Sequence, residues 1–132
     1  MAIYGIGTDL CEVARFEKSL ARDSFVDHVF SQQEQALLTA RTSKARTETA
    51  AANWAAKEAF TKAAGTGLAG FTLRDIAVLR QENGAPYFAC SGTAAAFLAA
   101  HALTAHLSIS HDGGMALAFV VLETTVPEKT HD

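Results

Sequence analysis

An alanine-rich stretch in the middle of the chain constrains the fold more than any other feature. The alanine content of residues 47–64 favours a long α-helix and lets neighbouring elements pack closely against it. Gly65 is a natural C-cap, and Lys62 in the last turn interacts favourably with the negative end of the helix dipole. We therefore expect a long central helix that ends at residue 64.

Shorter elements are predicted on both sides of this helix. A capping box at residues 31–34, in which a serine and a glutamate satisfy each other's backbone donors, predicts a helix through Leu38. Residues 25–30 and 41–46 are interpreted as connections. Further helices are expected around residues 13–22 and 93–103, and strands at residues 3–8, 76–80, 87–90, 106–111 and 115–122.

The resulting order, β-α-α-α-β-β-α-β-β, implies an α+β fold in which an antiparallel sheet packs against the long central helix. With 132 residues, of which 49% are apolar, the chain is long enough for one domain with its own core. We expect that domain to span residues 1–123 and residues 124–132 to form a frayed tail.

Charge and cysteine content exclude several classes of protein. A net charge of −3 argues against a general nucleic-acid binder, which would carry a basic excess. Cys11 and Cys90 are too few for a disulfide framework or a cysteine-rich metal site, so buried, reduced thiols are expected. No secretory signal opens the chain, and no apolar run approaches membrane-spanning length. These features predict a cytoplasmic protein with no membrane partner.

The segment WAAKEAFTK, residues 54–62, places charges among the alanines of the long helix. Glu58 and Lys62 are i,i+4 neighbours on one face, and Lys57 lies beside Glu58 around the helix. Two cations and one carboxylate suit a phosphate-bearing ligand with a metal ion. An ordinary surface ion pair has the same spacing, so the segment by itself leaves both interpretations open.

Asp9 is a candidate partner for Glu58. It follows the predicted strand at residues 3–8, and loops at the ends of elements often present functional side chains. The two carboxylates together would suit Mg²⁺, which takes one or two carboxylates and completes its shell with water and substrate phosphates. Judged on the residues alone, Asp9 as a helix cap and Glu58 as a solvated helix residue are the favoured interpretations.

The segment SISHDGG places Ser108, Ser110 and His111 at the end of a predicted strand, before a turn. His111 is suited to binding a phosphate or to acid–base catalysis, although a structural role, with Asp112 opening the turn, is the commoner case. A Ser-His-Asp hydrolase is rejected, because consecutive side chains diverge along a strand. Residues 65–68, GTGL, match neither a Walker loop nor a dinucleotide fingerprint, but their backbone amides could approach a phosphate.

A basic stripe accompanies the first predicted helix. Arg15, Lys18 and Arg22 follow the spacing i, i+3, i+7 on one face. A solvated surface is the usual explanation. A docking strip for an acidic partner is the alternative, and it would raise the association rate and orient the encounter.

In combination, these motifs resemble those of the holo-acyl-carrier-protein synthases, the short, single-repeat class of 4′-phosphopantetheinyl transferases. The resemblance covers nearly the whole chain. Its specific part is the order and spacing of GTDL at residues 7–10, AAKEAFTKAAGTG at residues 55–67 and SISHD at residues 108–112. Each of the three segments is unspecific when taken singly.

The resemblance implies a reaction between coenzyme A and an apo-acyl carrier protein, in which a carrier serine attacks the β-phosphate and 3′,5′-ADP is released. By similarity, Asp9 and Glu58 bind Mg²⁺, and Lys62 contacts the diphosphate. Glu58, directly or through a metal-bound water, helps to remove the serine proton. His111 and Asp112 match the family's SHD pair near the phosphates or the reacting centre. Contacts in the nucleotide pocket are implied for Thr66, Gly67, Pro86, Ser108 and His111.

The resemblance also implies a homotrimer with active sites between subunits, and it directs the basic stripe toward the acidic carrier protein. One position departs from the family pattern, because Asn53-Trp54 stands where Arg-Phe usually precedes AAKEA. The change removes an expected anion contact, for which Arg41, Lys44 or Arg46 would compensate. It keeps open a second interpretation, a non-catalytic coenzyme A-binding assembly module. A third interpretation is a metal-dependent phosphohydrolase.

Overall fold

Helix α4 (Ser43–Ala64) is the element around which the others pack. The computed structural model describes residues 1–125. Of the 22 residues of α4, 13 are buried, so the helix meets protein on most of its circumference. It begins at Ser43, so part of the connection expected at residues 41–46 is helical. It ends as predicted at Gly65, whose φ of 83° is the left-handed conformation that glycine adopts without strain.

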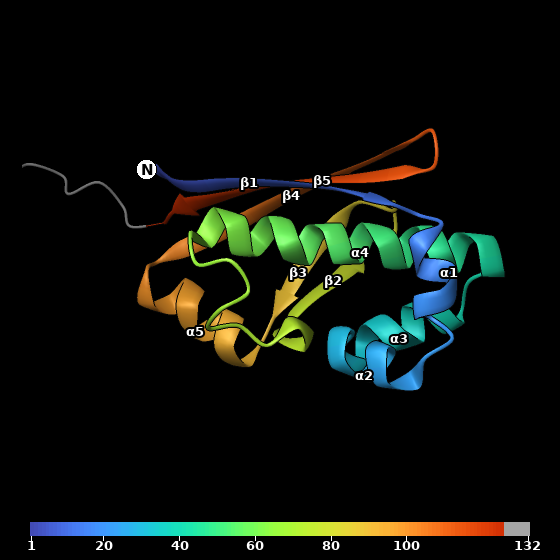
Figure 1. Cartoon of the computed structure of the whole chain (residues 1–132). Coiled ribbons are helices and arrows are strands. Elements are labelled where there is room, and N and C mark those ends of the chain that lie inside the picture. Colours follow the sequence, from blue (N-terminus) through green and yellow to red (C-terminus); the bar gives the residue numbers. More distant parts are fainter. Residues whose placement is uncertain (126–132) are drawn as a thin grey trace, which may run out of the picture.

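Two antiparallel sheets lie on either side of α4, where the sequence had indicated one (Figure 1). The larger sheet has the strand order β1-β5-β4 and contains β1 (Ile3–Glu12), β4 (Leu103–Asp112) and β5 (Met115–Thr124). The smaller sheet is the predicted hairpin of β2 (Ile76–Arg80) and β3 (Pro86–Cys90). The α+β prediction, with an antiparallel sheet against a long central helix, is confirmed.

Residue alternation decides which face of the larger sheet meets α4. The alternate residues Ala116, Ala118, Val120 and Leu122 of β5 are fully buried. Residues directly opposite one another in an antiparallel pair share a face, so Asp9, which pairs with Ala118, lies on the α4 side. Small alanines on both surfaces allow the sheet and the helix to approach closely.

Short helices cover the two ends of α4 (Figure 1). Helices α1 (Arg15–Ser19), α2 (Asp23–Val29) and α3 (Gln32–Thr39) lie at its N-terminal end, and α5 (Gly92–Ala100) lies at the other. The predicted capping box is present at α3, with Glu34 N donating to Ser31 Oγ and Ser31 N donating to Glu34 Oε1. Helix α2 was expected to be a connection. Its Phe25 ring packs 6.2 Å from that of Phe30 and 6.0 Å from that of Trp54, so long-range packing stabilises it.

Several predicted boundaries are wrong. Strand β1 continues to Glu12, so Asp9 lies within the strand and not after it. Strand β4 includes Asp112, so the following turn is formed by Gly113 and Gly114. Helix α5 ends at Ala100, because Leu103 already begins β4. Thr124, the first residue of the expected tail, is the last residue of β5, and its N donates to Ala2 O. Residues 126–132 lie outside the described part of the chain.

Candidate active site

Strand β1 and helix α4 touch through backbone atoms. A Cβ added at Gly7 would overlap the carbonyl oxygen of Ala59, and one added at Gly5 would overlap that of Ala63. Asp9 is the next residue of β1 on this face, so its side chain lies against the last turns of α4.

Asp9 contacts Lys62 at this junction. Lys62 Nζ lies 3.2 Å from Asp9 Oδ1 and donates a hydrogen bond to the backbone carbonyl of Thr8 at 3.0 Å. The fold thus joins two residues that are 53 positions apart in the sequence. The interpretation of Asp9 as a helix cap is wrong, because Ala14 is the N-cap of α1 and no side chain caps that helix.

Glu58 completes a cluster with these two residues, which we call the Asp9 cluster: Asp9, Glu58 and Lys62. Burial raises the pKa of the half-buried Glu58 carboxyl, the negative charge of Asp9 raises it further, and Lys62 opposes both effects. The two carboxylates are therefore close enough to repel one another. One ammonium group does not neutralise two carboxylates, so the cluster has a net negative charge and favours a cation.

The donor set of this cluster fits one kind of metal ion. Within residues 1–125, no three His, Cys, Asp or Glu side chains converge as a metal centre. A closed zinc site, which takes four protein ligands, does not fit here. Two carboxylates beside an exposed lysine fit Mg²⁺, because that ion keeps several waters and shares its shell with substrate phosphates.

The other predicted site residues lie on β4, at the start of β3 and in the segment after α4. His111 and Asp112 are exposed at the hairpin end of β4, where they pair with Ala116 and Met115. Ser108 alternates with core-facing residues and lies on the sheet face away from α4. Thr66 and Gly67 directly follow α4, and Pro86 opens β3. In the described part of the chain, no hydrogen bond or ion pair joins these side chains to the Asp9 cluster.

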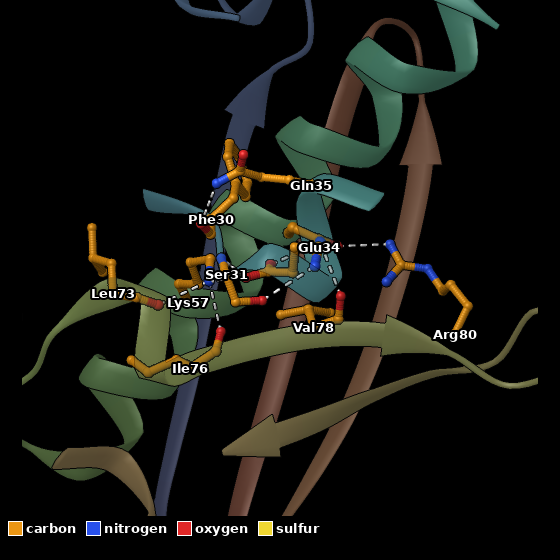
Figure 2. Close-up of polar contacts among 10 residues, drawn as sticks. Phe30, Ser31, Glu34, Gln35, Lys57, Leu73, Ile76, Val78 and Arg80 are labelled. Atoms are coloured by element: carbon orange, nitrogen blue, oxygen red, sulfur yellow. Dashed lines mark hydrogen bonds and ion pairs between the residues drawn. The ribbon is translucent and has the colours of Figure 1, made fainter. Parts of the chain in front are cut away.

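Lys57, the other cation of the WAAKEAFTK segment, is a core residue (Figure 2). Its Nζ lies 2.7 Å from Glu34 Oε1, and both side chains are completely buried. The same ammonium group donates to the carbonyl oxygens of Leu73 and Ile76 at 2.9 and 2.7 Å. The hypothesis that Lys57 faces a phosphate ligand is therefore wrong. Lys57 instead joins α4 to α3 and to the start of β2.

Asn53 belongs to the same buried network. Its Nδ2 donates to Glu34 Oε2 and to the carbonyl of Val78, both at 3.0 Å. Its Oδ1 accepts a hydrogen bond from Arg80 Nη2 at 2.9 Å. The guanidinium group at this position thus comes from β2. Burial lowers the pKa of Arg80 to about 10, with the charge of Arg41 adding to this effect and that of Glu34 opposing it.

The residues proposed to compensate for Asn53 do not include Arg80, because no local motif points to it. Arg46 Nε donates to the carbonyl of Leu38 at 2.9 Å, and its Nη2 donates to that of Arg41 at 3.1 Å. Arg46 therefore holds the junction between α3 and α4. The signal missed in the sequence is long-range, because Arg80 and Asn53 are 27 positions apart.

A sequence profile of the 4′-phosphopantetheinyl transferase superfamily matches residues 5–120. The matched range contains the whole Asp9 cluster and the SISHD segment. The chain belongs to this family.

Relatives of this transferase agree in length and in fold. A holo-[acyl-carrier-protein] synthase of Thiobacillus denitrificans is 42% identical over 131 residues, which cover 96% of this chain and 98% of the relative. A crystal structure of the Bacillus anthracis synthase, in complex with CoA (3′,5′-ADP), is 35% identical with a TM-score of 0.79 and covers 93% of this chain and 98% of its own. A Chronobacterium ammoniagenes ACPS–CoA complex is 32% identical with a TM-score of 0.78, covering 96% and 100%.

The basic residues of the transferase do not form one helical stripe. Arg15 and Lys18 lie in α1, but Arg22 lies beyond its end and is the N-cap of α2. All three side chains are exposed, and the Arg22 guanidinium lies 5.6 Å from the centre of the Phe25 ring.

A cavity of about 880 Å³ lies between α1, the start of α4 and the β4–β5 turn, separate from the Asp9 cluster.

Proposed function

We propose that this transferase moves the 4′-phosphopantetheine group of coenzyme A to a serine hydroxyl of an acyl carrier protein, and that Mg²⁺ assists. The observation that carries the proposal is the Asp9 cluster, in which GTDL and the KEAFTK segment of the same family profile meet in space. The synthase names of the relatives and the coenzyme A complexes of the structural neighbours support the choice of substrates.

In the proposed reaction, the serine oxygen of the carrier bonds to the β-phosphorus of coenzyme A. The bond from that phosphorus to the bridging oxygen breaks, 3′,5′-ADP leaves with the electron pair, and the serine proton passes to a base. Lys62 compensates the charge on the diphosphate. Because Thr8 O and Asp9 already hold its ammonium group, it reorganises little during the reaction. Glu58, directly or through a metal-bound water, would accept the proton.

Asp9 and Glu58 are the residues that would hold Mg²⁺, which when bound supplies further charge neutralisation at the diphosphate. His111 and Asp112 would contact the phosphates from the hairpin end of β4. The nucleotide would be enclosed by residues from several elements, namely Thr66, Gly67, Pro86, Ser108 and His111.

We further propose a homotrimer with its active sites between subunits. The face of the larger sheet away from α4 carries apolar side chains that are 40 to 60% exposed, namely Ile6, Leu10, Leu117 and Phe119. Such a patch is typical of a contact surface between proteins. Ser108 lies on this same face, so a second subunit there would bring it into a shared site.

Arg15, Lys18 and Arg22 would dock the acidic carrier protein, since clustered rim charges orient an encounter and raise its rate. Among residues 1–125, no helix is long and apolar enough to cross a membrane. We place the reaction in the cytoplasm, where coenzyme A and carrier proteins meet.

The test is to incubate the protein with coenzyme A, Mg²⁺ and several apo-carriers, and to weigh each carrier by mass spectrometry. A gain of one phosphopantetheine is expected, and chelation of the metal should abolish it. Coenzyme A binding in a calorimeter without any mass gain would instead support the non-catalytic module. Release of 3′,5′-ADP without a carrier would support the phosphohydrolase. The non-catalytic module was considered because Asn53 suggested a missing anion contact. Asn53 is instead bonded to Glu34 and Arg80 in the core, so its identity no longer favours that module.

A further inference from the structure

The glycines of β1 determine how closely α4 approaches the strand that carries Asp9. Neither Gly5 nor Gly7 has a positive φ, so their backbone conformations are open to any residue. The space around the two glycines, however, leaves no room for a side chain. Both face α4, and each would meet helix backbone if it carried a side chain.

The contact at Gly7 is the closer to the site. Besides overlapping Ala59 O, a Cβ at Gly7 would lie 2.7 Å from Ala63 N and 2.9 Å from Ala59 C. These are backbone atoms, which no rotamer change can move aside. An alanine at this position therefore has to push strand and helix apart by about 1.5 Å to reach ordinary contact distances.

This contact involves residues adjacent in the sequence to members of the Asp9 cluster. Ala59 and Ala63 directly follow Glu58 and Lys62 in α4, and Asp9 is the next residue after Gly7 on the same strand face. The nearest atoms that a Cβ at Gly5 would meet all belong to Ala63, and Gly5 lies a further two residues from Asp9. The chain thus offers two similar helix contacts, of which one is beside the carboxylates and one is not.

We propose that Gly7 is a positioning residue, whose missing side chain lets β1 lie against α4 and so sets how far Asp9 lies from Glu58, the two residues that would hold Mg²⁺. The inference rests on the proposed function, because it takes these carboxylates as the cation site. Mg²⁺ demands near-ideal geometry at about 2.0–2.1 Å, whereas Ca²⁺ accepts flexible geometry at about 2.3–2.6 Å. A larger distance between the Asp9 and Glu58 carboxylates should therefore weaken Mg²⁺ binding more than Ca²⁺ binding.

The experiment measures metal binding to the full chain without activity as a readout. Mn²⁺ is titrated and followed by electron paramagnetic resonance, and Mg²⁺ and Ca²⁺ are then used as competitors. In Gly7→Ala, Mn²⁺ and Mg²⁺ affinity should fall by at least about tenfold and Ca²⁺ affinity by less. Gly5→Ala is the matched control. It should lower the urea midpoint as well, yet keep all three affinities within about twofold of the wild type, since its helix contact is further from the carboxylates.

The carboxylate side chain supplies a second readout that a purely structural role would not affect. Asp9→Glu should weaken Mn²⁺ binding in the wild type but restore part of it in Gly7→Ala, because one extra methylene spans the added gap. If Gly7→Ala does not fold, Ala118→Val replaces it. Ala118 is fully buried opposite Asp9, so a larger side chain pushes α4 away by overpacking and should cause the same loss.

Wild-type affinity in a folded Gly7→Ala, or in Ala118→Val where that variant replaces it, would overturn the inference and leave the proposed function intact. Equal losses of Mn²⁺ affinity in Gly5→Ala and Gly7→Ala would also overturn it, since a general destabilisation would then explain both. Failure of the wild type itself to bind Mn²⁺ would refute the cation site of the proposed function, and the inference with it.

Discussion

Lys57 and Lys62 lie in one helix, and replacing each by methionine should separate folding from catalysis. Lys57→Met removes the ammonium group that donates to Glu34 and to two buried carbonyl oxygens. Breaking a buried ion pair by removing one partner typically destabilises by about 3–5 kcal/mol. Glu34 keeps its bonds from Ser31 N and Asn53 Nδ2, so we expect the lower end, about 3 kcal/mol. That is a large part of the roughly 5–15 kcal/mol that stabilise a domain.

Lys62→Met is the matched control, because it makes the same substitution in the same helix. The Lys62 side chain is 52% exposed, and an exposed ion pair contributes only about 0–1 kcal/mol. Urea unfolding followed by circular dichroism should therefore show a midpoint close to that of the wild type. Carrier modification, followed by mass spectrometry, should fall by at least about 100-fold, as when a group that stabilises transition-state charge is lost.

Two results would refute this reasoning. One is a Lys57→Met protein whose free energy of unfolding lies within about 1 kcal/mol of the wild type, because removing one partner of a buried pair should leave the Glu34 charge buried without its cation. The other concerns the double variant Glu34→Gln with Lys57→Met. If the two residues form a pair, the double variant should be less destabilised than the sum of the single variants by at least about 1 kcal/mol, and simple additivity would contradict the pair.

Further predictions concern a thiol, the outer sheet face and the basic residues. Partial burial raises the pKa of Cys90 from 9.0 to about 11, so a thiol reagent near neutral pH should label it more slowly in the folded chain than after denaturant is added, and equal labelling rates in both states would contradict the raised pKa. Because the folded state favours the protonated thiol, this contribution to stability is complete below pH 9.0 and is lost as the pH rises toward 11 in a urea-unfolding series. Leu117→Glu should turn the proposed trimer into a folded monomer in light scattering, and a persisting trimer would rule this face out as the interface. Arg22→Glu should slow carrier modification by roughly tenfold at low salt and progressively less at high salt, while a salt-independent effect would argue against electrostatic docking.

Local signals in the sequence were sufficient for much of the fold. The capping box at Ser31 and the glycine C-cap at Gly65 depend on residues within one helical turn, and both are present where the sequence placed them. The hairpin of β2 and β3 has the same basis. Helix α2 has no such signal, because Phe25 and its neighbours are held by packing against distant parts of the chain, including Trp54.

The burial of α4 explains why its charged residues could not be assigned from the sequence. In a helix that is apolar on one face only, the sequence indicates which side chains reach solvent. In α4, the helix's own alanines lie on nearly all sides, so no such face can be recognised. Lys57 and Lys62 look equivalent within such a segment. They differ only through partners that folding supplies, namely Glu34, 23 positions from Lys57, and Asp9, 53 positions from Lys62.

Asn53 shows the same limit at a single position. Within its motif, it replaces an arginine and suggests a weakened anion site. In the folded chain it is completely buried, and all of its hydrogen bonds go to protein atoms, among them Arg80 on a neighbouring strand. An arginine placed at position 53 would compete with Arg80 for the same region beside Glu34. The residue at position 53 therefore has to be judged together with the residue at position 80, because the core has room and negative charge for a guanidinium group but does not require it to come from α4.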